Sequence, residues 1–223
     1  IFARFGQMEV TRIPYEDKQP YAIVIDNVFS LAECQALIDR SETQGYDIAY
    51  VNAGNELILD TDYRRGSRCI IDDADVANEV WARVKAHVPN SLSGYRALEV
   101  NERLRFLRYD PGDFFRRHPD GCYQRPDSHP KGGDVSLLTL QLYLNEGFEG
   151  GSTRFFARME DGSEHFDVVP KTGSVLLFQH RLYHSGEELI AGRKYTIRTE
   201  VMYTRRPQCE PQISSWFQKL MGR

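Results

Sequence analysis

The chain has 223 residues, 41% of them hydrophobic and 27% charged, a composition typical of a soluble globular protein with one substantial core. The formal net charge is only −4, and acidic and basic residues are interspersed, so we expect no nucleic-acid partner. No apolar run is long enough to cross a bilayer, so we also expect no membrane span.

The cellular compartment is weakly determined. Residue 1 is Ile rather than Met, so the N-terminus looks truncated and the sequence does not exclude a signal peptide. The cysteines are scattered without a C-x-x-C pair, which favours reduced structural thiols over a zinc ribbon or a redox motif; they are Cys34, Cys69, Cys122 and Cys209. A soluble, cytoplasmic protein is the favoured expectation.

The first hundred residues contain two patterns typical of helices. An apolar run at 21–25 predicts a buried strand, and Ser30 with Glu33 has the spacing of a capping box, so a helix should begin there and end near Gly45. A second amphipathic pattern at 73–87 repeats valines four residues apart. We expect both helices to buttress a sheet.

From residue 103 the hydrophobic period changes to two, in short runs at 104–109, 137–144, 175–178 and 194–203 separated by Gly and Pro. This order predicts an α+β fold, a double-sheet jelly roll backed by N-terminal helices. We predict one domain over 1–223, with a helix-rich part at 1–100, a jelly-roll core at 101–205 and a tail at 206–223. Helical spacing of Trp216, Phe217 and Leu220 predicts a terminal helix in that tail.

The segment that ends in His118-Pro119-Asp120 is the first candidate for chemistry. If it is an extended strand, Phe114, Arg116, His118 and Asp120 project from one face, so His118 and Asp120 can chelate one ion. A lone H-x-D is common, and by itself it is more often a surface histidine beside a solvated carboxylate. A third ligand is needed to make the pattern specific.

Two histidines compete for that third position, His180 and His184. We favour His184, because Lys194 follows ten residues later on the next strand, where its cation could reach the far end of a ligand that chelates the same metal. His180 is then a supporting or structural residue. Two imidazoles and one carboxylate form the facial triad of non-haem iron(II) oxygenases, which leaves open positions for 2-oxoglutarate and O2.

The far carboxylate of 2-oxoglutarate would be buried and would need a paired cation. Lys194 is the first choice. Alternation places Lys194 and Arg198 on one face of their strand, so Arg198 is an alternative, and Arg193 should point the other way. On the strand at 137–144, a polar stripe that includes Tyr143 suits a pocket wall.

With these residues assembled, the chain resembles the prolyl 4-hydroxylase-like branch of the iron(II)- and 2-oxoglutarate-dependent dioxygenases. The likeness is close over residues 100–203 and looser over 21–45. It is carried by the segments 108–112, 118–120, 138–145, 150–155, 170–173, 184–186 and 192–195.

The resemblance implies a double-stranded β-helix and a dependence on Fe(II), 2-oxoglutarate and O2, with ascorbate as a further candidate. It also implies that Tyr109, Tyr143 and Lys194 contact 2-oxoglutarate, together with Thr153. Tyr195 stands where many relatives have Trp, a difference that affects packing more than chemistry.

The resemblance leaves the substrate open, because similar enzymes hydroxylate proline in a peptide or protein, a free amino acid or another small molecule. Two segments are candidate lids over the site: 54–68, which contains Tyr63-Arg64-Arg65, and 121–133, which contains Tyr123, Arg125 and His129. A halogenase is disfavoured, because Asp120 fills the coordination position that a halide would need.

Two other classes compete with a hydroxylase. A cupin-type metal-binding protein could use similar strands, but it would have no reason to build a carboxylate site from Lys194 and Tyr143. A zinc hydrolase would need a general base near the metal-bound water, and the only close acids are Glu187 and Glu188, which are more simply surface residues.

Overall fold

The computed structural model describes residues 7–14, 20–53, 56–156 and 164–205. Within these ranges, no helix has both the length and the apolar character needed to cross a membrane. The predicted terminal helix at Trp216, Phe217 and Leu220 lies outside the described residues, and so does Cys209.

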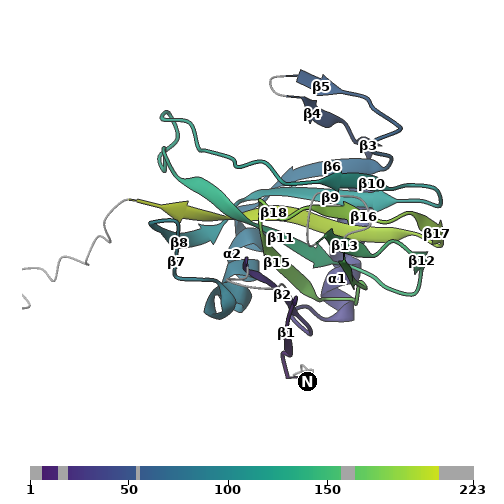
Figure 1. Cartoon of the computed structure of the whole chain (residues 1–223), viewed down its shortest axis with the longest axis horizontal. Helices are drawn as coiled ribbons and strands as arrows, with labels where there is room; N and C mark the ends of the chain where they lie inside the picture. The colour runs from purple at the N-terminus through teal and green to yellow at the C-terminus, as the bar shows by residue number, and fades with distance from the viewer. Residues whose placement is uncertain (1–6, 15–19, 54–55, 157–163, 206–223) are drawn as a thin grey trace, which may run out of the picture.

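Most of the described strands belong to one large antiparallel sheet (Figure 1). Its strand order is β1-β2-β15-β11-β18-β9-β6-β3, and β8, which carries β7 on its other side, also pairs with β18. The bounds are β1 Val10–Arg12, β2 Ala22–Ile25, β3 Asp47–Ile48, β6 Ser67–Asp72, β7 Ser91–Leu92, β8 Tyr95–Val100, β9 Arg103–Tyr109, β11 Val135–Tyr143, β15 Val175–Gln179 and β18 Lys194–Thr204.

A smaller sheet packs against part of the large one. Its order is β10-β16-β13-β14, with bounds Phe115–His118, His184–Gly186, Thr153–Phe156 and His165–Val168 in that order. Apolar side chains from both sheets form one buried cluster between them, to which the large sheet contributes Tyr143 and Phe178 and the small sheet Phe155. Two sheets packed in this way form a jelly roll, so the predicted fold class is confirmed.

Two short two-stranded sheets complete the strands. β12 Glu149–Gly150 pairs with β17 Leu189–Ala191, and β4 Val51–Ala53 pairs with β5 Glu56–Ile58. The β4–β5 hairpin stands away from the body of the molecule (Figure 1). It precedes β6, and its base reaches the rim of the pocket described below.

The helices cover the face of the large sheet that points away from the small sheet. Helix α1 is Leu31–Gln44, helix α2 is Ala74–Val84, and a 3-10 turn at Lys85–His87 follows α2. Ser30 and Glu33 form the predicted capping box, and Gly45 follows the last turn with a positive φ of 88°. Apolar residues of both helices share one core cluster with alternate residues of the sheet strands. Successive side chains of each strand therefore point alternately toward the face that the helices cover and toward the face that carries the pocket.

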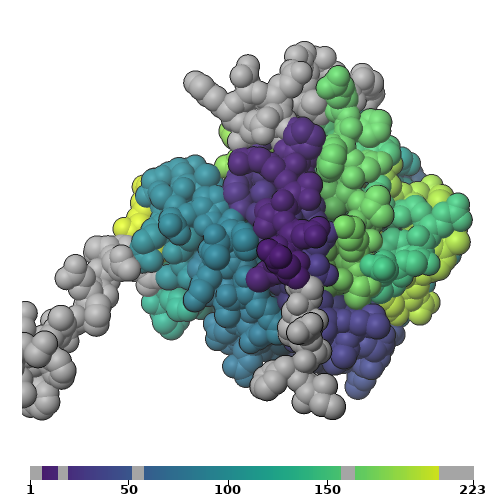
Figure 2. Space-filling view, turned by 90° about the horizontal axis from the view of Figure 1, so that it is seen from below, coloured from purple at the N-terminus to yellow at the C-terminus, as the bar shows by residue number. Residues whose placement is uncertain are grey.

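The N-terminal part differs from the prediction. Residues 1–100 contain the two expected helices, but they also supply β2, β6 and β8 to the large sheet. In Figure 2 the N-terminal segment, in purple, runs across the surface between the teal residues around α2 and the green residues of the C-terminal half. The run at 21–25 pairs with β15, so it is an integral strand of the sheet. A description of this part as helix-rich is incomplete, because short strands in it carry little period-two signal.

Candidate functional site

Two histidines come together where β10 pairs with β16. His118 lies directly opposite His184 in the register, and the two ring centroids are 4.3 Å apart. Both side chains are buried. Phe115 stacks on His118 with a centroid distance of 3.6 Å, and Phe178 packs edge-on against His184 at 4.7 Å. The aromatic packing fixes the two imidazole planes.

Asp120 lies close to these two histidines, but not through the strand alternation that the sequence analysis predicted. β10 ends at His118, and its register shifts between Phe115 and His118, so Asp120 lies beyond the strand. The Asp120 amide donates to the carbonyl of His180 at 2.8 Å, which turns the chain back toward the histidines. The prediction that His118 and Asp120 converge holds, but the alternating strand proposed as its cause is wrong.

The three side chains have the geometry of a metal site. One ligand atom from each of His118, Asp120 and His184 lies within 4.8 Å of the other two. The Nε2 atoms of His118 and His184 are 3.9 Å and 3.7 Å from the Asp120 carboxylate oxygens. Distances of this size leave room for one ion at about 2 Å from each ligand atom.

The protonation states also fit a metal. His118 Nδ1 donates to the carbonyl of Arg116 at 2.6 Å, and His184 Nδ1 donates to that of Leu182 at 3.0 Å, so both Nε2 lone pairs face Asp120. In metal sites, a hydrogen bond from the ring nitrogen that does not bind the metal commonly orients the imidazole ligand. Burial lowers the pKa of His118 to about 3 and also lowers the pKa of His184, so both rings are neutral at pH 7. The donor set suits iron(II).

Asp120 stays ionised although its carboxylate is 7% exposed. Burial alone would raise its pKa, but the charge of Arg198, together with the hydrogen bond from Thr139, outweighs burial and lowers the pKa below its usual range. Arg198 Nη2 lies 2.8 Å from Asp120 Oδ1, and the Thr139 hydroxyl donates to Oδ2 at 2.5 Å. The carboxylate is therefore held in one orientation.

His180 supports this carboxylate rather than joining the cluster. Since the Thr139 hydroxyl donates to Asp120, it accepts from His180 Nδ1 at 2.9 Å, which leaves His180 Nε2 to accept from Ser136 at 3.0 Å. Burial lowers the pKa of His180 to about 4, consistent with a neutral ring. A chain of hydrogen bonds thus runs from Ser136 to Asp120.

The three side chains open onto a cavity of about 430 Å³, and Lys194 lies on its wall. Lys194 is 3% exposed, and its Nζ donates to the Gly151 carbonyl at 2.6 Å. Across the described ranges, no carboxylate oxygen lies within 4.0 Å of this ammonium. Burial lowers the pKa of Lys194 to about 7. A buried cation without a counter-ion is the partner that a buried carboxylate of a ligand requires.

Three of the other residues predicted to contact 2-oxoglutarate surround Lys194. Its Nζ is 5.3 Å from the ring centroid of Tyr109, its neighbour across β9 and β18, and 5.7 Å from that of Tyr143. The Tyr143 hydroxyl donates to Thr153 Oγ1 at 2.8 Å, and Gln141 Nε2 also donates to it at 3.2 Å. Thr153 therefore has its own hydroxyl hydrogen left for a ligand.

Arg198, the alternative to Lys194, already has partners. It bridges Asp120 and Glu200, whose Oε1 lies 3.1 Å from Arg198 Nη1. Arg193 points away, as expected, and pairs with Asp110 at 2.5 Å on the surface. The ion pairs therefore distinguish Lys194 from Arg198 as the partner of the cosubstrate carboxylate. Within the described residues, Arg198 already has carboxylate partners and Lys194 has none.

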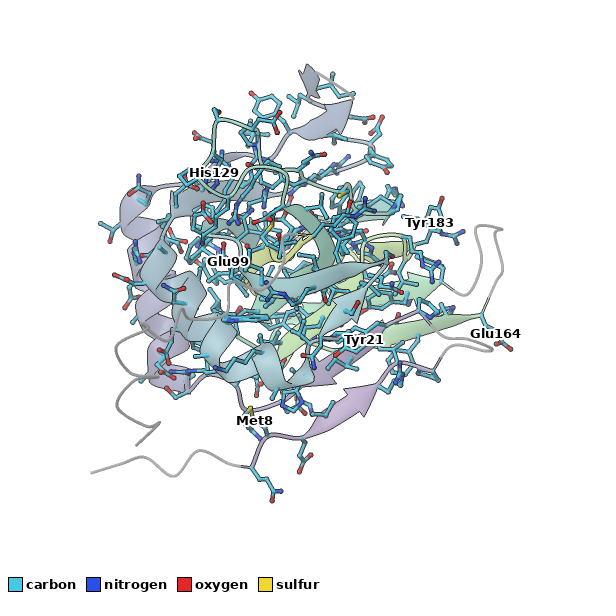
Figure 3. All side chains as sticks on the ribbon, turned by 90° about the vertical axis from the view of Figure 1, so that its left-hand side faces the viewer. Met8, Tyr21, Glu99, His129, Glu164 and Tyr183 are labelled. Atoms are coloured by element: carbon cyan, nitrogen blue, oxygen red, sulfur yellow. The ribbon has the colours of Figure 1, made fainter. Side chains whose placement is uncertain are left out.

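Both candidate lid segments contribute residues to the cavity, but not every residue named in them does. Tyr63 and Arg64 line the cavity from the first segment, and Tyr123 lines it from the second. His129 lies at the same end of the molecule as Glu99, as Figure 3 shows. Arg125 is 1% exposed and makes ion pairs with carboxylates near that end. Arg125 is therefore a structural residue, which corrects its assignment to a lid.

The two acids considered for a zinc hydrolase face elsewhere. Glu187 pairs with Arg154 at 2.8 Å and accepts from the Ser185 hydroxyl, and Glu188 is exposed. Among the described cysteines, Cys34 and Cys69 are buried, and Cys122 is exposed and free.

The sequence analysis missed two cavity residues, Arg105 and Glu200, and it included Arg64 and Arg68 only as part of a candidate lid. Arg105 and Glu200 could have been found, because each alternates in register with a predicted site residue: Arg105 lies four residues before Tyr109, and Glu200 two after Arg198. Arg64 and Arg68 carry no such signal, since a bridge to Phe115 brings Arg64 to the site and the pairing of β6 with β9 brings Arg68.

Comparisons with known proteins agree with this geometry. The sequence model of the 2OG-Fe(II) oxygenase superfamily matches residues 104–199. The chain is 24% identical over 196 residues to prolyl 4-hydroxylase 1 of Arabidopsis thaliana, an alignment that covers 79% of this chain and 67% of that protein. It is 23% identical over 202 residues to probable prolyl 4-hydroxylase 8 of the same plant, covering 80% and 67%.

Solved structures share the fold. A Pseudomonas putida prolyl-4-hydroxylase superposes with a TM-score of 0.58 at 19% identity, covering 83% of this chain and 93% of that one. A Trichoplax adhaerens prolyl hydroxylase, in complex with a hypoxia inducible factor peptide fragment, gives a TM-score of 0.58 at 17% identity, with 81% and 82% covered.

The jelly roll, the His-Asp-His cluster and the family match together define a non-haem iron(II) dioxygenase that uses 2-oxoglutarate and O2. Within that class, residues 104–199 match the 2OG-Fe(II) oxygenase superfamily, and the chain is similar to prolyl 4-hydroxylases. The cupin-type and zinc hydrolase alternatives are thereby set aside.

Proposed function

We propose that this dioxygenase hydroxylates proline in a peptide or protein, with His118, Asp120 and His184 as its iron ligands. The observation that carries the proposal is the arrangement of one cavity, in which the three ligand atoms lie within 4.8 Å of one another and the unpaired, buried Lys194 lies on the same wall. One end of 2-oxoglutarate would meet the metal and the other end Lys194. When bound, iron(II) supplies the activation of O2, with one oxygen atom passing to the substrate carbon and the other to succinate, and CO2 is released.

The protein residues then have separate tasks. Lys194 neutralises the far carboxylate of 2-oxoglutarate, and Thr153 can donate its free hydroxyl hydrogen to the same group. Tyr109 and Tyr143 wall this end of the cavity and exclude water, which strengthens the ion pair. Arg198 has no part in that pair, because it holds Asp120 in place.

Proline as the substrate is supported by two observations. The relatives named above are prolyl hydroxylases, and one of them is a complex with a peptide fragment. The outer part of the cavity is lined by the aromatic rings of Tyr50, Tyr63 and Tyr123, which offer flat surfaces to a pyrrolidine ring. A free amino acid or another small molecule is the alternative substrate.

The test is an anaerobic titration with iron(II) and 2-oxoglutarate, followed by O2 labelled with heavy oxygen and mass spectrometry of the products. The substrates are proline-rich peptides, matched peptides with alanine in place of proline, and free amino acids. We expect one labelled oxygen atom on proline and one in succinate. Oxygen insertion in free amino acids alone would contradict a peptide substrate. An absence of labelled succinate would contradict the assignment of the three iron ligands.

His184→Ala is the matched variant for this experiment, because it removes one ligand and leaves Asp120 with its partners. It should bind no iron in the anaerobic titration. Iron retention by this variant at the parent level would contradict the role proposed for His184.

A further inference from the structure

The cavity carries more positive charge than iron and 2-oxoglutarate account for. Iron(II) and the 2-oxoglutarate dianion have equal and opposite charges, so the net charge of the cavity is the same before and after they bind. Cationic side chains in a partly buried cavity attract an anion. The lining contains five basic side chains, Arg64, Arg68, Arg105, Lys194 and Arg198, against the two carboxylates of Asp120 and Glu200.

Three of the five cations have partners assigned. Arg198 pairs with Asp120, and Arg105 Nη1 lies 2.8 Å from Glu200 Oε1. Lys194 is the proposed partner of the cosubstrate carboxylate. Arg64 and Arg68 are left, and in the part of the chain that the structure describes neither has a carboxylate oxygen within 4.0 Å.

Arg64 lies next to the candidate metal site. Its guanidinium carbon is 4.5 Å from the ring centroid of Phe115, the ring that stacks on His118. Its Nη1 donates to the Tyr50 carbonyl at 3.2 Å, and it also interacts with the Tyr109 hydroxyl. Its Nε is buried and has no hydrogen-bond partner among the described residues. A buried donor without an acceptor is costly, and a ligand oxygen could satisfy it.

Arg68 faces the same cavity from β6. It lies opposite Leu107 of β9 and, on the other side, opposite the exposed Asp47 of β3. Burial lowers the pKa of Arg68, the like charges of Arg64 and Arg105 lower it further, and the charge of Asp47 raises it only in part, so the pKa stays below its usual value.

The backbone between Arg64 and Arg68 lies close to Tyr109, at the end of the cavity proposed to hold 2-oxoglutarate. Gly66 has a φ of 145°, and a Cβ at this position would lie 3.3 Å from the Tyr109 ring. Only glycine allows that approach with this backbone. Arg64 and Arg68 are therefore held on either side of a fixed contact with Tyr109.

We propose that Arg64 and Arg68 bind a carboxylate of the substrate, so that the enzyme selects a proline that has an anionic group close to it. Two guanidinium groups present planar pairs of donors that match a carboxylate. The carboxylate could come from an acidic side chain beside the proline, or from the α-carboxylate of a C-terminal or free proline. The proposal rests on the hydroxylase function above and narrows its substrate class.

The test measures binding rather than turnover, on the full chain loaded with manganese(II) and 2-oxoglutarate without O2. The probes are end-blocked pentapeptides with a central proline flanked by glutamate, glutamine or lysine. A blocked-N-terminal peptide ending in proline with a free carboxylate, and free proline, distinguish the two sources. We expect the preferred carboxylate probe to bind about 10- to 100-fold more tightly than its neutral counterpart.

Two variants and a control locate the effect. Arg68→Gln should remove most of this preference and leave the affinity for 2-oxoglutarate within about twofold, and Arg68→Lys should retain part of it, because lysine keeps the charge without the paired donors. Arg103→Gln is the control: Arg103 is on the neighbouring strand, but it is half exposed and pairs with Asp72 at 3.3 Å on the surface. It should bind every probe as the parent does.

A salt titration of the parent enzyme needs no variant. Added potassium chloride should weaken binding of the carboxylate probe and leave the glutamine probe nearly unchanged. Equal binding of all probes, binding of none of them, or a loss of 2-oxoglutarate affinity in Arg68→Gln would overturn the inference. If iron and 2-oxoglutarate themselves fail to bind, the proposed function fails. If they bind and form succinate while the charge of the peptide has no effect, only the carboxylate site fails.

Discussion

Lys194 should make the binding of 2-oxoglutarate dependent on pH in the neutral range. Burial lowers the pKa of the free Lys194 ammonium to about 7, and a carboxylate beside it raises that pKa again in the complex. The cosubstrate therefore binds the protonated lysine, so its affinity is greatest below pH 7 and falls as the pH rises above this value. The His118 imidazole does not titrate in this window, because burial lowers its pKa to about 3.

The size of the effect follows from the pKa. One pH unit above it, about one lysine in ten is protonated, so the Kd at pH 8 should be about tenfold higher than at pH 6. Lys194→Met removes the charge and keeps a side chain of similar length. It should raise the Kd at pH 6 about 30-fold or more, the cost of removing one partner of a buried ion pair, and abolish the pH dependence.

The assay is anaerobic calorimetry of the manganese(II)-loaded enzyme, in buffers of different ionisation enthalpy that count the protons taken up. At pH 8 about one proton should enter with the ligand. Arg193→Met is the matched control, because Arg193 is the adjacent residue but pairs with Asp110 on the surface. The reasoning is refuted if Lys194→Met keeps the pH slope of the parent, or if Arg193→Met loses it.

Three further outcomes are expected. His184→Ala should abolish iron retention and succinate formation, whereas His180→Ala should keep measurable turnover; metal analysis and a succinate assay check this, and the reverse pattern would exchange their roles. Thr139→Val removes the hydroxyl that donates to Asp120 and should weaken iron binding about 10- to 100-fold in a chelator competition, with recovery in Thr139→Ser; unchanged binding would show that the hydroxyl does not orient the ligand. Arg125→Met removes a buried guanidinium that pairs with Glu99 and Glu102 and should lower the free energy of unfolding by about 3 kcal/mol in urea, while the affinity for 2-oxoglutarate stays at the parent value; a stability equal to the parent's would contradict its structural role.

Local sequence signals predicted much of the fold correctly. The capping box at Ser30 and Glu33 marked the start of α1, because these side chains satisfy backbone donors within one turn. The alternation in 194–203 correctly placed Lys194 and Arg198 on one face of β18. Apart from the strand at 21–25, the short strands of residues 1–100 were not predicted, since partners distant in sequence determine their pairing.

The site itself was partly predictable. The H-x-D segment and the two later histidines were visible as residue types, and the offset of Lys194 favoured His184 over His180. The position of Asp120 depended on a hydrogen bond to the His180 carbonyl, which no local pattern shows. The ion pair of Arg198 with Asp120 could not be predicted either, because the two residues lie far apart in the sequence.

By itself, the sequence determined which side chains are available for chemistry, two histidines, an aspartate and a lysine, and the strand period that places Lys194 and Arg198 on one face. These depend on residue identity and on spacings of a few residues, which the backbone geometry of helices and strands translates directly. Only the tertiary structure decided which cations remain unpaired. Arg105 and Arg198 form ion pairs, whereas Arg64 and Arg68 form none with the carboxylates of the described residues, because an ion pair depends on distances across strands that lie far apart in the chain.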